Sequence, residues 1–175
     1  MPELPEVETI RRNINASLAE RVLVSVDVRL PKLLRDSPLP DPTILQGCRL
    51  VEADRRAKVL TTGFSNDLSL MVHFKLAGQF AILRPDGSRL VAGHPVPDPS
   101  GAYPHKASHI DFRFDDGTIA YYSDVRQFGW LRLIPTADVQ RALDAFAFGP
   151  EGVGETIDPK RLSAIMSARS IPVKT

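Results

Sequence analysis

The chain begins Met1-Pro2-Glu3-Leu4-Pro5-Glu6-Val7-Glu8, and an amphipathic helix starts within these residues. From residue 4 to residue 18, apolar side chains recur at spacings of three and four, which is the periodicity of one helix face. Pro5 suits the first helical turn, because its missing N–H group would have no partner there. Glu6 and Glu8 suit the same turn, since the N-terminus of a helix favours negative charge. We therefore expect a helix over residues 4–18.

Pro2 becomes a reactive group if Met1 is removed, and methionine removal tolerates a small second residue such as proline. The free secondary amine would stand beside the Glu3 carboxylate. Because α-amines titrate near pKa ~7.7–8, a usable fraction would be neutral at pH 7 and able to form a Schiff base with a carbonyl-like carbon. If Met1 stays in place, Pro2 is an amide nitrogen and the nucleophile is masked. A plainer interpretation also stands, in which proline and glutamate are simply good residues for starting a helix.

Length and composition are those of a globular protein rather than of a membrane or disulfide-rich one. The chain has 175 residues, of which 43% are hydrophobic and 25% charged, and no apolar run is long enough to cross a membrane. The single cysteine, Cys48, excludes an internal disulfide and a four-cysteine zinc site. A net charge of +1 gives little average attraction for polyanions, so any such binding would rely on local basic runs. We expect a cytoplasmic protein.

Alternating apolar and polar residues, interrupted by turn signals, predict about eight strands after the first helix. Proline-rich residues 31–43 and 92–107 predict loops, with a short extended piece at Leu33-Leu34. Thr136 or Asp138 would cap a helix that runs to about Ala145, and Asp158-Pro159 would start another over 159–168. The expected strands cover residues 22–30, 48–55, 58–64, 68–75, 79–84, 108–114, 118–123 and 129–134.

This order of elements predicts an α+β fold that is mainly β. We expect a two-layer β-sandwich with an N-terminal helix and flanking helices.

The first twelve residues closely resemble the opening of bacterial formamidopyrimidine-DNA glycosylases, which remove oxidised purines from DNA. They read Met-Pro-Glu-Leu-Pro-Glu-Val-Glu-Thr-Ile-Arg-Arg. The resemblance implies that Pro2, as the mature N-terminus, is the nucleophile and that Glu3 is the acid. It also implies that Glu6 holds water or the lesion within the pocket.

Two further runs resemble motifs of this family. Arg55-Arg56-Ala57-Lys58-Val59-Leu60 resembles a strand whose lysine reaches the active site, so Lys58 would contact the phosphate next to the lesion and assist β-elimination. His73-Phe74-Lys75-Leu76-Ala77-Gly78 resembles a His-x-x-Met-(Ser/Thr)-Gly run, in which His73 would contact phosphate. Leu76 stands where the family has a methionine that fills the gap left by the everted base. It keeps an apolar wedge but lacks the flexible thioether.

Ser123-Asp124-Val125-Arg126-Gln127-Phe128-Gly129 resembles the family's Asp-Pro-Arg-Arg-Phe-Gly loop. Arg126 would then read the base opposite the lesion, and Phe128 would wedge between base pairs. These roles make physical sense, because a cation and an apolar plug offset the few kcal/mol that base extrusion costs, roughly. Gln127 replaces one arginine of the loop. Taken without the resemblance, the run is better explained as a turn with a buried Phe128 and Trp130.

The end of the sequence resembles the beginning of a second domain. Phe148-Gly149-Pro150-Glu151 resembles the Leu-Gly-Pro-Glu link that precedes the family's helix–two-turn–helix domain. We expect a catalytic domain over residues 1–135, a helix and linker over 136–157, and the start of that second domain over 158–175, cut short. Arg169 and Lys174 are candidate DNA contacts there. Because the family's zinc finger is missing, we expect no metal and no cofactor in this chain.

The resemblance implies an enzyme of base-excision repair, a DNA glycosylase and AP lyase for 8-oxoguanine and formamidopyrimidines that acts through a Schiff base. The partner would be damaged double-stranded DNA, with no membrane, and the protein a bacterial monomer. One alternative is an endonuclease VIII-like specificity for oxidised pyrimidines, which Leu76 favours and Leu4-Pro5 disfavours. Another is a catalytically silent module that binds DNA or another protein.

Overall fold

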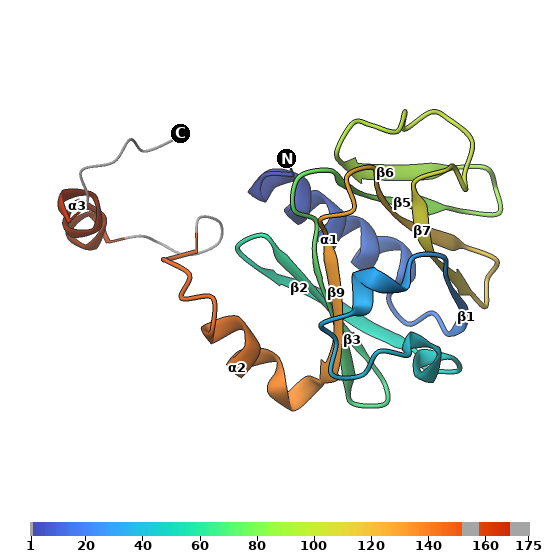
Figure 1. Cartoon of the computed structure of the whole chain (residues 1–175), viewed down its shortest axis with the longest axis horizontal. Coiled ribbons are helices and arrows are strands. Elements are labelled where there is room, and N and C mark those ends of the chain that lie inside the picture. The colour runs from blue at the N-terminus through green and yellow to red at the C-terminus, as the bar shows by residue number, and fades with distance from the viewer. Residues whose placement is uncertain (1, 152–157, 169–175) are drawn as a thin grey trace.

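Two antiparallel sheets face each other in the computed structural model, which describes residues 2–151 and 158–168 (Figure 1). The sheets have five and four strands, which confirms the predicted sandwich and adds one strand to the eight expected. The five-stranded sheet has the order β1 (Leu23–Val28), β7 (Ser108–Phe114), β8 (Ile119–Asp124), β5 (Gly78–Leu83), β6 (Arg89–Gly93). The four-stranded sheet has the order β2 (Leu50–Arg56), β3 (Val59–Phe64), β4 (Leu68–His73), β9 (Trp130–Pro135).

The predicted first helix is present as α1 (Leu4–Leu18), and it packs against the edge strands β2 and β6 of the two sheets. An uncovered sheet edge presents unpaired backbone groups, so a helix placed there protects both edges. Asn15 of α1 does this directly on β2. Its side-chain amide donates to the Ala53 carbonyl at 2.8 Å and accepts from the Ala53 N–H at 2.7 Å. The apolar face of α1, with Val7, Ile10, Ile14 and Leu18, is buried.

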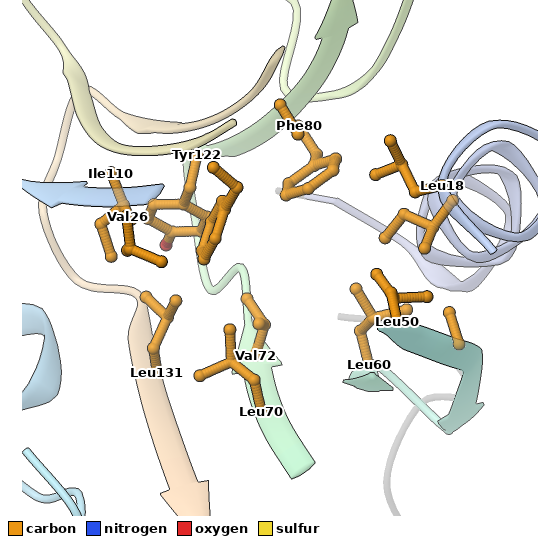
Figure 2. Close-up of a cluster of buried hydrophobic side chains, with 14 of the residues drawn as sticks. Leu18, Val26, Leu50, Leu60, Leu70, Val72, Phe80, Ile110, Tyr122 and Leu131 are labelled. Atoms are coloured by element: carbon orange, nitrogen blue, oxygen red, sulfur yellow. The ribbon is translucent and has the colours of Figure 1, made fainter. Parts of the chain in front are cut away.

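The core lies between the sheets, and side chains from both converge in it (Figure 2). Such alternation is why the strands could be recognised from apolar periodicity. The four-stranded sheet contributes Leu60, Leu70, Val72 and Leu131, and the five-stranded sheet contributes Val26, Phe80, Ile110 and Tyr122.

Two local predictions were wrong. Residues 89–93 form strand β6, which pairs with β5 as a hairpin, although no strand was expected there. Because β6 is an edge strand partly covered by α1, none of its residues is fully buried and it lacks clear alternation. Leu33-Leu34 is not extended but ends a 3₁₀ helix, η1 (Pro31–Leu34), which buries both leucines. A second 3₁₀ helix, η2 (Pro42–Leu45), follows in the same proline-rich region.

The predicted late helices are present but short. A 3₁₀ turn, η3 (Thr136–Asp138), leads into α2 (Val139–Asp144), and α3 (Pro159–Ser167) begins after Asp158, whose carboxylate accepts from the Lys160 N–H at 3.1 Å. Residues around α2 pack on a small cluster formed by Val59, Met71 and Ile134 of the four-stranded sheet. Within the described ranges, none of the helices has the length and apolar character needed to cross a membrane. The domain boundaries at 135 and 157 stay predictions.

Candidate active site

Two chain crossings between the sheets lie side by side at one end of the sandwich. The first runs from His73 at the end of β4 to Gly78 at the start of β5, and the second from Asp124 of β8 to Trp130 of β9. His73 pairs with Trp130 in one sheet, and Gly78 pairs with Asp124 in the other, so the two crossings begin and end as neighbours. These crossings carry Leu76 in the first and Arg126 with Phe128 in the second.

The turn that carries Lys58 lies at the same end, because Val59 pairs with His73. The Lys58 Nζ atom is 3.2 Å from the Glu3 Oε2 atom. Pro2, directly before Glu3, is buried at the start of α1. The structure therefore brings the predicted lysine to the predicted nucleophile and acid, although the sequence separates Lys58 from Glu3 by 55 positions.

Glu6 has a definite structural task in this cluster. Its carboxylate accepts a hydrogen bond from the Glu3 N–H group at 2.9 Å, one half of a capping box at the helix start. This contact fixes the backbone beside Pro2. A role for Glu6 towards water or lesion stays a prediction.

His73 has an assignable tautomer. Its Nδ1 atom accepts a hydrogen bond from the Lys75 N–H at 3.0 Å, so in the neutral ring the proton sits on Nε2. Burial first, then the Lys75 and Lys58 cations, lower the pKa of His73 from 6.5 to about 4. At neutral pH the ring is therefore uncharged and offers Nε2–H as a donor, which suits a phosphate contact by hydrogen bond rather than by charge.

This depressed pKa predicts a pH dependence of stability. Below pH 6.5 the unfolded chain gains a proton at His73 that the folded chain does not accept until about pH 4. The contribution of His73 to the free energy of unfolding should thus be fully present above about pH 6.5. It should be lost as the pH drops towards about 4. Urea unfolding at pH 5.0 and 7.5 should show a smaller pH difference for His73→Asn than for the unaltered chain. Equal differences in the two proteins would contradict this assignment.

The crossing with Arg126 and Phe128 is held by Asp124, which is fully buried. The Asp124 carboxylate accepts from the backbone N–H groups of Arg126 at 3.0 Å and Gly129 at 2.7 Å. Phe128 is nevertheless 55% exposed, and the Arg126 guanidinium lies 5.1 Å from its ring centroid. The loop backbone held by Asp124 thus presents a cation and an apolar ring to solvent. The alternative of a buried phenylalanine in a plain turn is wrong.

His109 contacts the backbone of Asp124, at the start of this loop. It is buried, and its Nε2 atom lies 2.9 Å from the Asp124 carbonyl oxygen, which fits a structural role. Next to the exposed loop is a hollow of about 300 Å³. Lys32, Arg35 and Arg126 line it together with Asp36, which pairs with Arg35 at 3.5 Å. Cations therefore outnumber carboxylates around this hollow, despite the low net charge of the chain.

Sequence reasoning missed two parts of this site. The first is Asp124, which holds the loop; an aspartate two residues before a turn N–H is a turn signal that could have indicated this role. The second omission is an ion network behind the site. The Glu8 carboxylate binds Arg11, Arg12 and Arg55, and these contacts, led by the one with Arg11, hold the pKa of Glu8 at about 2.

Two predicted DNA contacts, Arg169 and Lys174, lie outside the described residues. Among the residues that are described, no three His, Cys, Asp or Glu side chains gather closely enough to hold a metal ion.

Known proteins share the sequence and the fold of this chain. Residues 1–131 match the family model for the formamidopyrimidine-DNA glycosylase N-terminal domain. The chain is 37% identical over 180 residues to the formamidopyrimidine-DNA glycosylase of Caulobacter sp. (strain K31), with 100% of this chain and 60% of that protein covered. An enzyme of the same name from Methylorubrum extorquens is 32% identical, with 99% and 58% covered.

Solved structures agree. Lactococcus lactis Fpg, in a complex with DNA containing N7-benzyl-Fapy-dG, superposes with a TM-score of 0.77 at 26% identity, covering 94% of this chain and 55% of that one. The same protein with DNA containing an oxidised pyrimidine superposes with a TM-score of 0.76 at 27% identity, covering 94% and 56%.

The sandwich, with α1 across its edges and the two crossings at one end, is the fold of a DNA glycosylase N-terminal domain. More particularly, the chain belongs to the formamidopyrimidine-DNA glycosylase family. It spans 60% or less of the length of the curated relatives just described.

Proposed function

We propose that this protein is a DNA glycosylase of base-excision repair that removes oxidised purines from duplex DNA and then nicks the strand. The observation that carries the proposal is the contact between Lys58 and Glu3, directly beside Pro2. This contact places the Lys58 ammonium and the Glu3 carboxylate close to Pro2, whose amine would be the nucleophile. Relatives that bear the name formamidopyrimidine-DNA glycosylase support it. Bacterial relatives and a DNA substrate make the bacterial cytoplasm the proposed compartment.

The chemistry begins once Met1 has been removed. The Pro2 nitrogen attacks C1′ of the extruded nucleotide, the bond from C1′ to the base breaks, and the base leaves with a proton from the Glu3–Lys58 pair. Opening of the sugar ring turns the adduct into a Schiff base. Loss of a proton from C2′ then expels the 3′ phosphate, and water hydrolyses the imine to free Pro2. Apart from the DNA and water, these steps use only groups of the chain, so we propose that the reaction uses no cofactor.

The loop at the second crossing would stabilise the extruded state. Unstacking a base costs a few kcal/mol, roughly, and an exposed Phe128 ring can fill part of the vacated stack. Arg126 would donate to the acceptor edge of the base left opposite, which favours cytosine. Lys58 and the Nε2–H of His73 would hold phosphates near the lesion.

Lesion preference tests the proposal. Single-turnover excision should be faster on a duplex with 8-oxoguanine opposite cytosine than on one with thymine glycol. A preference for thymine glycol would instead support the endonuclease VIII-like alternative, which the apolar Leu76 favours. For protein that begins with Pro2, salt-sensitive binding of duplex DNA without excision of either lesion would show a binding module and contradict the proposal.

A further inference from the structure

Glu151, in the segment that follows α2, is bound to the turn that carries Lys58. Its side chain is only 10% exposed. The carboxylate accepts hydrogen bonds from Arg55 Nη1 at 2.9 Å, Arg56 Nη1 at 3.2 Å and the Ala57 N–H group at 2.9 Å. All three donors precede Lys58 directly in the chain. Glu151, more than ninety positions away in the chain, thus binds both side chains and backbone of the β2–β3 turn.

The β2–β3 turn contains a residue in an unfavourable backbone conformation. Ala57 has a φ of +50°, a left-handed conformation that non-glycine residues adopt at a cost of roughly 1 kcal/mol. Its N–H group is held in place by Glu151. Arg55, whose side chain is 5% exposed, also bonds Glu8 of α1 at 2.8 Å. The chain Glu151–Arg55–Glu8 therefore fixes the Lys58 turn relative to α1, at whose start Glu3 lies.

A second line of contacts joins the same segment to His73. Phe148 stacks on Phe146 with ring centroids 5.1 Å apart, and Phe146 stacks on Trp130 at 6.0 Å. Trp130 in turn lies 5.7 Å from the His73 ring. The docked segment, residues 146–151, thus connects to both the lysine turn and the histidine end of the site.

We propose that Glu151 is a positioning residue for catalysis: by holding the Ala57 N–H and Arg55, it sets the place where the Lys58 ammonium meets Glu3. Docking of residues 146–151 then completes the active site. The inference deepens the proposed function and rests on it only for its effect on excision. A misplacement of about 1 Å in such a group can cost about a hundredfold in rate.

Chemical labelling tests the positioning without any need for activity. Glu151→Gln keeps an acceptor for Ala57 N–H but removes the charge that binds Arg55 and Arg56. Acetylation of lysines by acetic anhydride, followed by mass spectrometry of peptides, should show Lys58 labelled several-fold faster in this variant. Lys32, an exposed lysine on η1, should react at an unchanged rate. Glu20→Gln is the matched control, since Glu20 pairs with Arg49 at 3.0 Å on the surface.

Excision kinetics give the second readout. In Glu151→Gln the single-turnover rate on 8-oxoguanine duplex should fall about 10–100-fold, while the Kd for that duplex changes less than about threefold. Glu20→Gln should change neither. Unchanged Lys58 labelling, or weakened DNA binding with no loss of rate, would overturn the inference. If the unaltered protein, shown by intact mass to lack Met1, excises nothing, the proposed function fails, and the labelling alone still decides whether Glu151 positions Lys58.

Discussion

Protein that keeps Met1 should excise 8-oxoguanine at least about a thousandfold more slowly than protein that begins with Pro2, a loss of more than about 4 kcal/mol in transition-state stabilisation. With Met1 attached, the Pro2 nitrogen is an amide whose lone pair is delocalised, so it cannot attack C1′. The lysine and the carboxylate remain in place. The comparison therefore removes the nucleophile and little else.

Both forms can be separated and assigned by intact mass, and each is then measured in single-turnover excision with excess protein. Their Kd values for the same duplex should agree within about threefold, because both forms carry one terminal amine and the same residues in the Arg126–Phe128 loop. Equal excision rates from the two forms would contradict a role for Pro2 as nucleophile.

Gly129→Ala should lower the free energy of unfolding by about 3 kcal/mol or more. A Cβ atom at this position would lie 1.9 Å from the Tyr122 hydroxyl and 3.0 Å from the Asp124 Oδ2 atom. Tyr122 is fully buried, so the clash can be relieved only by moving the core or the loop. Burial, followed by the nearby Asp124 carboxylate, raises the pKa of Tyr122 well above 10.0, and the crowded hydroxyl stays neutral.

Urea unfolding followed by circular dichroism measures this effect, and Gly149→Ala is its control. A Cβ atom at Gly149 meets nothing within 4 Å, so that variant should stay within about 0.5 kcal/mol of the unaltered chain. Because the same clash displaces the loop with Arg126 and Phe128, Gly129→Ala should also lose excision. Equal stabilities of the two variants would contradict the packing described around Asp124.

The elements that sequence could predict are those with a local cause. Helix α1 follows from its periodicity and acidic first turn, and eight strands follow from alternation between turn signals. Strand β6 was missed because it lies at a sheet edge under α1, where partial burial on both sides erases the alternation. The 3₁₀ helix at Leu33-Leu34 was mistaken for an extended piece because two adjacent apolar residues fit either conformation.

In the site, too, local motifs indicate the individual residues but not the contacts between them. Motifs named Pro2, Glu3 and Lys58 separately, but the 3.2 Å contact between Lys58 and Glu3 depends on where β2 meets α1. The network around Arg55 joins Glu8 and Glu151, 47 and 96 residues away, and no local pattern in the sequence indicates such pairs. Tertiary packing, rather than any motif, decides how these charges meet.

Borohydride trapping on a duplex that contains an abasic site tests the central claim most directly. Protein shown by intact mass to lack Met1 is mixed with the duplex and reduced, and the adduct is digested and located by peptide mass spectrometry. The account predicts a covalent adduct on the Pro2 nitrogen and none with protein that keeps Met1. An adduct on Lys58 or another lysine, or no adduct on protein that begins with Pro2, would contradict it.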